Sequence, residues 1–281
     1  MKKFGVGIQL YGVRNALSAD FEGTLRALSE LGYEYVEFAG NYGGKSGEEI
    51  KALLDKYNLK CVSVHQGVDF LAEKPEEKIS FLKSFGVKFF VQPWYDAAKL
   101  ADSPVWEETK TVFQNAAHLL KKNGMLFGYH NHEFEFRTFG GKYLHDYIFE
   151  AVPEDEIVPE LDTCWVRYAG LDPAEKLRQF KGRVPVVHLK DFTCKHLAAG
   201  PVYDLIDEEG GSTKKPATRE ENGFEFRPLG RGMQDFAKIL NACEECGTDV
   251  VIVEQDQVYD GMTELEAARI SREYLKETFG L

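Results

Sequence analysis

The chain has 281 residues, 43% of them hydrophobic, and a formal net charge of -12. This length suits one domain with a single large core, which we expect to span residues 1–281. Sequence-independent nucleic-acid binding depends on clustered Lys and Arg, so the acidic balance argues against that class of partner and favours a small-molecule substrate.

Strand-like and helix-like runs alternate along the whole chain. Eight predicted strands begin near Phe4, Tyr33, Leu59, Val87, Met125, Ile157, Val184 and Asp249. Eight segments with apolar residues at intervals of three and four predict helices at 21–32, 48–58, 75–86, 106–124, 141–152, 172–182, 235–247 and 263–280. This order predicts an α/β fold, a (β/α)8 TIM barrel.

One stretch departs from this rhythm. Residues 192–231 are rich in Gly, Pro and charge and carry neither pattern. They follow the seventh predicted strand, whose carboxyl end lies on the catalytic face of a TIM barrel. We therefore expect a long loop over the active-site face.

Neither secretion nor membrane insertion is indicated. The segment MKKFGVGIQLYGVRN turns polar after about seven residues, too few for a signal peptide. No later run approaches the roughly 18 apolar residues of a membrane span. The five cysteines follow no disulfide framework, and Cys243 and Cys246 lie in a helical pattern that favours packing over a zinc or redox role. We expect a cytoplasmic protein with reduced thiols.

Four predicted strands end in side chains suited to metal binding or acid/base chemistry. Their sequences are FGYHNH (127–132), VPELD (158–162), VPVVHLKD (184–191) and VVIVEQD (250–256). Residues two apart on a strand share a face, which pairs His130 with His132, Glu160 with Asp162, and His188 with Lys190. If Val158, Val186, Val250 and Ile252 fill the barrel interior, these pairs lie at its mouth and form one divalent-metal active site.

Short segments along nearly the whole chain resemble one family. In order they are GIQLYGVR, VEFAG, VSVHQ, YHNHEFEF, ELDTCW, HLKD, LGRGMQDF and VEQD. Together they look like the sugar phosphate isomerase/epimerase family, which has the xylose-isomerase-like barrel. YHNH and VEQD are similar to segments of inosose dehydratases. The resemblance extends to ketose 3-epimerases, isomerases, dehydratases and abasic-site endonucleases.

The resemblance implies one divalent metal ion held by Glu, Asp, His and Glu on strands five to eight. Asp162, His188 and Glu254 match the last three positions, and His130 stands where Glu is usual. We expect His130, Asp162, His188 and Glu254 as ligands, with Glu160 as an alternative ligand or base. Two imidazoles and two carboxylates suit Mn, Co, Zn or Fe better than Mg, and Mn is our first expectation.

Further residues receive roles from their positions. Glu254 is the expected base on one substrate face, Glu160 or His132 acts on the other, and Lys190 stabilises an oxyanion. Glu160 is equally well placed for a structural ion pair with Lys190 or Arg231. The expected substrate-binding residues are His65, Glu37, Trp165 and Arg231.

These residues predict a sugar isomerase or epimerase that removes a proton α to a carbonyl and stabilises the resulting enediolate. The alternative is an inosose-dehydratase-like lyase, because the first step is the same. An abasic-site endonuclease, which needs several zinc ions, and a noncatalytic sugar-binding protein are weaker readings. The expected partner is a sugar or cyclitol, and barrels of this kind often form homo-oligomers.

Overall fold

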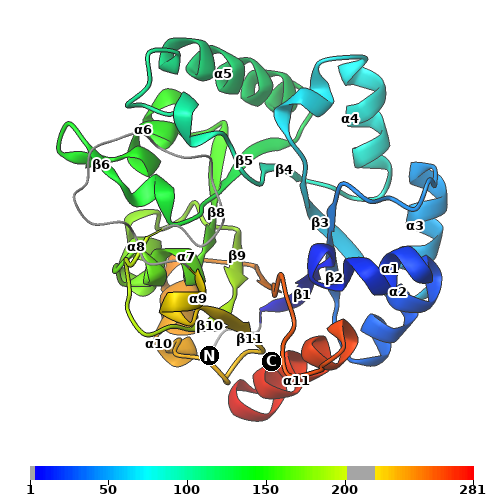
Figure 1. The fold of residues 1–281 in the computed structure, drawn as a ribbon. Helices are drawn as coiled ribbons and strands as arrows, with labels where there is room; N and C mark the ends of the chain where they lie inside the picture. The colour runs from blue at the N-terminus through cyan, green and yellow to red at the C-terminus, as the bar shows by residue number, and fades with distance from the viewer. Residues whose placement is uncertain (1–3, 201–218) are drawn as a thin grey trace.

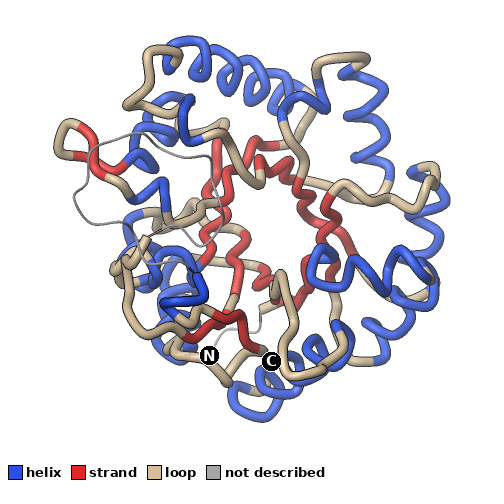
Figure 2. The backbone as a smooth tube through the Cα atoms, viewed as in Figure 1, coloured by secondary structure: helices blue, strands red, loops and turns tan. Residues whose placement is uncertain are grey.

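The computed structural model describes residues 4–200 and 219–281, which contain a closed barrel of eight parallel strands (Figures 1 and 2). Around the barrel the strand order is β1, β12, β9, β8, β5, β4, β3 and β2. The strands are β1 (Gly5–Gln9), β2 (Tyr35–Ala39), β3 (Lys60–His65), β4 (Phe89–Gln92), β5 (Leu126–His130), β8 (Ile157–Asp162), β9 (Val186–Leu189) and β12 (Val250–Val253). The predicted TIM barrel is confirmed.

Eight helices cover the outside of the barrel and correspond to the predicted helical segments (Figure 1). They are α2 (Phe21–Glu30), α3 (Gly47–Lys56), α4 (Pro75–Ser84), α5 (Trp106–Lys122), α6 (Leu144–Ala151), α8 (Pro173–Gln179), α10 (Phe236–Cys246) and α11 (Glu264–Phe279). Local capping explains several boundaries. Ser46 and Glu49 form a capping box on α3, Asp172 caps α8, and Gly247 ends α10 with a φ of 83°. Cys243 and Cys246 are free and buried in α10.

Short elements follow the carboxyl ends of several strands and were not predicted. They are η1 (Leu10–Val13), α1 (Arg14–Ala19), η2 (Val68–Leu71), η3 (Ala97–Lys99), η4 (Phe134–Phe136), the hairpin β6 (Thr138–Phe139) and β7 (Lys142–Tyr143), and α7 (Thr163–Tyr168). At two to six residues, they are too short to display a hydrophobic period. Within the described residues, no helix is long and apolar enough to cross a membrane.

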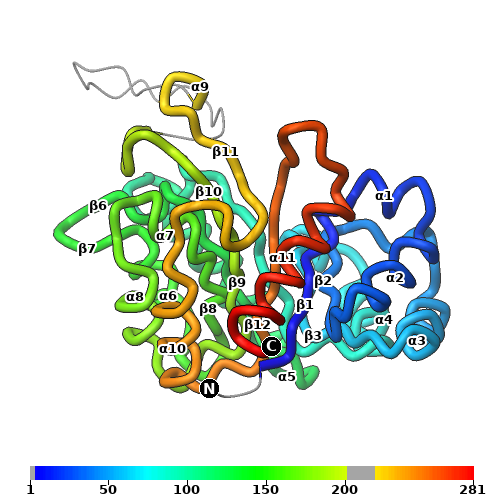
Figure 3. Tube along the Cα trace, turned by 90° about the horizontal axis from the view of Figure 1, so that it is seen from below, coloured from blue at the N-terminus to red at the C-terminus, as the bar shows by residue number. Residues whose placement is uncertain are grey.

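The predicted long loop begins and ends on an antiparallel pair, β10 (Asp191–Thr193) and β11 (Glu225–Arg227), with α9 (Arg219–Asn222) beside it. Residues 201–218 of this loop lie outside the described residues. Figure 3 shows β10, β11 and α9 above one side of the barrel. Phe224 stacks on Trp165 of α7 at a ring distance of 5.7 Å, and Phe226 meets the same ring edge-on. The loop therefore packs on α7 through aromatic contacts.

Asp191 holds the returning end of this loop. Its carboxylate accepts backbone N–H bonds from Phe192, Gly230, Gly232 and Gln234, at 2.9 to 3.2 Å. Gly232 is required here, because an added Cβ would lie 2.2 Å from Oδ1 of Asp191. Asp191 thus ties the loop to the end of β9, next to His188 and Lys190.

The barrel interior is apolar below and polar at the mouth. Val186, Val250 and Ile252 form a buried cluster packed by Tyr35, Val62 and Phe89. Gly7 makes room for this packing, since an added Cβ would lie 2.4 Å from Cδ1 of Ile252. Register then places His130 beside Glu160 and Asp162 beside His188. The polar pairs of neighbouring strands therefore meet.

Candidate metal centre and active site

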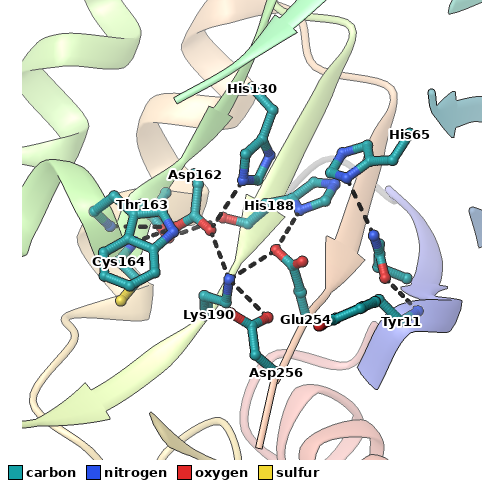
Figure 4. Close-up of polar contacts among 12 residues, drawn as sticks. Tyr11, His65, His130, Asp162, Thr163, Cys164, His188, Lys190, Glu254 and Asp256 are labelled. Carbon is teal, nitrogen blue, oxygen red and sulfur yellow. Dashed lines mark hydrogen bonds and ion pairs between the residues drawn. The ribbon is translucent and has the colours of Figure 1, made fainter. Parts of the chain in front are cut away.

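Six side chains from strand ends converge at the mouth of the barrel. Figure 4 shows His65, His130, Asp162, His188 and Glu254 among them. Each of the six is at most 6% exposed. They are His65 of β3, His130 of β5, Glu160 and Asp162 of β8, His188 of β9, and Glu254 immediately after β12. Buried ionisable groups are costly unless they are paired or bind a cation, so this cluster is a functional-site candidate.

The cluster contains two overlapping groups whose ligand atoms lie within 4.8 Å of one another. The first, here called the Asp162 set, consists of His130, Asp162, His188 and Glu254, the four ligands expected from the sequence. The second, here called the His65 set, consists of His65, His130, Glu160 and His188. Because both sets use His130 and His188, the geometry poses a choice between two positions for one ion.

One carboxylate oxygen of the Asp162 set is open to a cation. Oδ1 of Asp162 caps α7 by accepting N–H bonds from Cys164 at 2.7 Å and Trp165 at 3.3 Å. Oδ2 has no hydrogen bond among the described residues and lies 3.7 Å from Nε2 of His130. Nδ1 of His188 lies 2.9 Å from Oε2 of Glu254. These donor atoms fit a divalent transition metal, which accepts both imidazole and carboxylate ligands.

Lys190 adds a positive charge beside this set. Its Nζ lies 3.0 Å from Oε2 of Glu254, 3.0 Å from Oδ1 of Asp256 and 3.4 Å from Oδ2 of Asp162. The same ammonium lies 5.1 Å from the ring centroid of Trp165 and 5.2 Å from that of Phe226. Aromatic faces and carboxylates thus hold Lys190, which is 1% exposed.

The pKa values within the cluster are pushed in opposite directions. Burial lowers the pKa of His130 to about 3, so its imidazole is neutral and has a lone pair for a metal. Burial opposes ionisation of Glu254, but Lys190 and His188 hold its pKa well below the usual range. Burial raises the pKa of Asp162 to about 7, while Lys190 opposes the rise and Glu254 adds to it.

Three imidazoles surround the carboxylate of Glu160. Its Oε2 is 2.5 Å from Nε2 of His65, 3.2 Å from Nε2 of His188 and 3.5 Å from Nδ1 of His130. Burial opposes its ionisation, but His188 and His65 hold the pKa of Glu160 well below its usual range. The contacts of Glu160 are therefore to imidazoles, whereas the sequence had suggested Lys190 or Arg231 as a partner.

The expected substrate-binding residues fall in three environments. His65 is in the cluster, and Glu37 is fully buried, with Oε1 2.9 Å from Nε2 of His188. Trp165 is buried, and its ring lies 5.5 Å from the ring of His132. Arg231 is exposed on the turn tied to Asp191. Their substrate-binding roles remain predictions.

Three residues of the site were not assigned from the sequence. Gln9 ends β1 and hydrogen-bonds to His65, Asp256 pairs with Lys190, and Glu135 supports the turn after β5. Gln9 could have been found by also considering strands that end in an amide, and Asp256 closes the segment VVIVEQD but was given no role. Glu135 gave no such signal, because it lies on η4 rather than on a strand.

Glu135 links that turn to the barrel. It accepts the backbone N–H of His132 at 2.8 Å and contacts the hydroxyl of Tyr129 at 2.9 Å. Burial raises its pKa to about 8. The pKa of Glu135 is therefore higher in the folded protein than in the unfolded chain. Its contribution to the free energy of unfolding is fully present in acid and is lost as the pH rises through about 8.

Glu135→Gln is expected to reduce this alkaline loss of stability. Urea unfolding at about pH 6 and about pH 9.5 should show the wild-type free energy of unfolding falling by a few kcal/mol more than that of the variant. Glu150→Gln, at an exposed residue that pairs with Lys142, is the control. Equal pH dependence in wild type and Glu135→Gln would contradict the interpretation.

Comparison with known proteins agrees with the geometry. A family model for the xylose isomerase-like TIM barrel matches residues 25–278. An inosose dehydratase of Geobacillus kaustophilus is 26% identical over 280 residues, covering 89% of this chain and 85% of that protein. A sugar phosphate isomerase/epimerase structure from Parabacteroides distasonis is 21% identical, with a TM-score of 0.74 over 97% of this chain and 98% of that chain.

A further solved structure carries a metal. The IOLI protein with a bound zinc atom is 14% identical, with a TM-score of 0.68, and the alignment covers 97% of each chain. At these identities the solved structures establish the fold alone. The resemblance noted from the sequence is confirmed by the family model and by the inosose dehydratase relatives, which are enzymes. The family model matches most of the length of this chain, which shows that the chain belongs to the xylose isomerase-like TIM barrel family.

Proposed function

We propose that this protein is a divalent-metal-dependent enzyme that removes the proton α to the carbonyl of a keto-sugar or keto-cyclitol. The observation that carries the proposal is the convergence of the Asp162 set, two imidazoles and two carboxylates, beside the buried ammonium of Lys190. A base next to cationic groups is what proton removal from carbon needs, because negative charge then develops on the neighbouring oxygen.

His130, Asp162, His188 and Glu254 would hold the metal. Bound there, a divalent ion would act as a Lewis acid that polarises the substrate carbonyl and orients an adjacent hydroxyl. Mn is our first expectation, with Co, Zn and Fe compatible with the same donors.

Side chains of the protein supply the base and the positive charge that the reaction needs. Glu254 is ionised, because Lys190 and His188 hold its pKa low, and it is the proposed base because its carboxylate lies beside Lys190 at the mouth of the barrel. Lys190 places a fixed positive charge beside the oxygen on which negative charge develops. The rings of His132 and Trp165 lie 5.5 Å apart and are tilted by 34°, and the fully buried Trp165 packs against Lys190.

The second step separates two reaction classes. An isomerase or epimerase returns a proton to carbon from the other face, the role proposed for Glu160 or His132. A dehydratase instead uses an acid to help expel the β-hydroxyl. Lys190 can donate a proton to a leaving oxygen.

Two observations favour dehydration as the second step. The curated relatives that align over about nine-tenths of this chain are inosose dehydratases, at 23% to 26% identity. The usual strand-five Glu, which the resemblance assigns as an epimerase base, is His130 here. We therefore place dehydration of a keto-cyclitol or keto-sugar first and isomerisation or epimerisation second.

Solvent-deuterium incorporation tests the proposal. The purified protein, loaded with Mn, is incubated in deuterium oxide with a panel of ketoses and keto-inositols, and products are identified by NMR and mass spectrometry. Exchange at the α carbon that is lost on chelation supports the shared first step. Loss of water identifies the dehydratase, whereas a deuterated sugar isomer identifies the isomerase or epimerase. A metal-loaded protein that exchanges no proton on any member of the panel would contradict the proposal.

A further inference from the structure

We propose that Gln9 fixes the ring proton of His65 on Nε2, which makes His65 a hydrogen-bond donor to Glu160 and excludes it as a metal ligand. Gln9 and His65 are then positioning residues that assign the metal to the Asp162 set. The inference deepens the proposed function, on which its metal assignment rests. It also reassigns His65, which the sequence suggested as a substrate contact.

The orientation of the Gln9 amide is set by the backbone. The N–H of Tyr11 donates to Oε1 of Gln9 at 2.5 Å. A backbone N–H can only donate, so this oxygen cannot be exchanged for the amide nitrogen without placing two donors face to face. The Gln9 side chain is 2% exposed and therefore has little access to water as another partner. Its NH2 group consequently faces Nδ1 of His65.

The tautomer of His65 follows from this orientation. Nε2 of Gln9 lies 3.1 Å from Nδ1 of His65 and donates to it, so Nδ1 carries a lone pair and no proton. Burial opposes protonation of His65, but Glu37 and Glu160 raise its pKa, and both carboxylates face Nε2, so the ring proton is on Nε2. That nitrogen donates to Oε2 of Glu160 at 2.5 Å, and Oε1 of Glu37 lies 3.2 Å away. Both neighbours of the N–H group are carboxylates, which are hydrogen-bond acceptors.

A nitrogen that carries a proton has no lone pair for a metal. Nε2 is the His65 atom that approaches the other members of the His65 set, so this tautomer removes one of its four ligands. Oε2 of Glu160 accepts from His65, whereas its Oε1 has no hydrogen bond among the described residues. The His65 set therefore becomes a hydrogen-bonded layer around a carboxylate.

The two histidines that belong to both sets each have one ring nitrogen near Glu160 and the other near a member of the Asp162 set. Nδ1 of His130 lies 3.5 Å from Oε2 of Glu160, and its other nitrogen, Nε2, faces Asp162. Nε2 of His188 lies 3.2 Å from Oε2 of Glu160, and its Nδ1 faces Glu254. Metal-binding histidines commonly present their second nitrogen to a carboxylate, which fixes the ring orientation. Glu160, which His65 contacts, has this position for His130. For His188 it shares the position with Glu37, whose Oε1 lies 2.9 Å from Nε2 of that ring.

The first test reads the tautomer directly. Nitrogen-15 NMR of the full-length protein, metal-free and zinc-loaded, is recorded for wild type and Gln9→Met, with the His65 signals identified by their loss in His65→Asn. We expect the Nε2–H tautomer in both wild-type samples and a mixed population in Gln9→Met. Gln92→Met is the matched control, because Gln92 is also a buried strand-end glutamine, but it bonds to the backbone of Val68 and Trp94. It should leave the His65 signals unchanged.

The second test compares metal affinities. Zinc binding is measured by competition with a chromophoric chelator for wild type, His65→Asn and Asp162→Asn. We expect one zinc per chain in wild type, a loss of about 10-fold to 100-fold in affinity for His65→Asn, and a clearly larger loss for Asp162→Asn. The inference is overturned by a wild-type His65 protonated on Nδ1, or by equal losses in the two variants. A wild-type protein that binds no zinc removes the metal in the proposed function, while the tautomer in the metal-free protein still decides the role of Gln9.

Discussion

Glu254→Gln is expected to lower the rate of α-proton exchange by roughly 1,000-fold while the protein remains folded. The amide has almost the same volume as the carboxylate but cannot accept a proton or carry negative charge. Glu254 also contacts both His188 and Lys190, so the substitution weakens the metal site as well as the proposed base. The initial rate of deuterium incorporation, measured with saturating Mn, separates slow chemistry from weak metal binding.

Asp256→Asn is the matched control for this experiment. Asp256 contacts Lys190 at the same distance as Glu254, 3.0 Å, but lies outside both candidate ligand sets. If pairing with Lys190 were the main contribution of Glu254, the two variants would lose similar activity. We expect Asp256→Asn to retain most of the exchange rate. Exchange in Glu254→Gln within about 10-fold of wild type would exclude Glu254 as the base.

Lys190→Met is expected to lower the free energy of unfolding by about 3 to 5 kcal/mol in the metal-free protein. The buried ammonium contacts Asp162, Glu254 and Asp256, and its removal deprives all three carboxylates of a shared positive charge. A divalent ion in the Asp162 set supplies part of that charge. Saturating zinc or Mn should therefore restore more stability to the variant than it adds to wild type, in urea titrations with and without metal.

Lys176→Met separates this effect from the general cost of losing a buried lysine. Lys176 is 3% exposed and pairs with Asp146 at 2.9 Å, among the rings of Phe136, Tyr143 and Phe180. Its loss should destabilise the protein, but the metal should add no more stability to this variant than to wild type. An equal response to metal in Lys176→Met and Lys190→Met would show that Lys190 is not coupled to the metal site.

Much of the barrel and most of the cluster were predictable from local patterns. The alternation of strand and helix periods defined the barrel, because each period reflects which face of one element is buried. Spacing by two residues placed Glu160 with Asp162 on one face of β8. In a parallel barrel the carboxyl ends of all strands meet at one mouth, so the strand-end residues were expected to converge. In the structure, the ligand atoms of the Asp162 set lie within 4.8 Å of one another, and so do those of the His65 set.

Asp191 illustrates a limit of the same reasoning. It ends the segment VPVVHLKD and appears in the sequence as one more acid at a strand end. In the structure its carboxylate accepts four backbone N–H bonds, most of them from residues about forty positions later in the chain. The pattern of β9 could not reveal this, because the partners belong to a loop that carries no periodic signal.

The sequence by itself therefore determined the barrel and the strand-end residues that meet at its mouth, while the chemistry of the site is a proposal. Only the tertiary structure decided how the six central side chains divide between two overlapping ligand sets. That division depends on which nitrogen of His65 carries the proton. The proton is positioned by Gln9 and Glu160, which lie 56 and 95 residues away from His65 in sequence. Hydrogen-bond direction between such distant residues is set by closure of the barrel and leaves no trace in the local pattern of any strand.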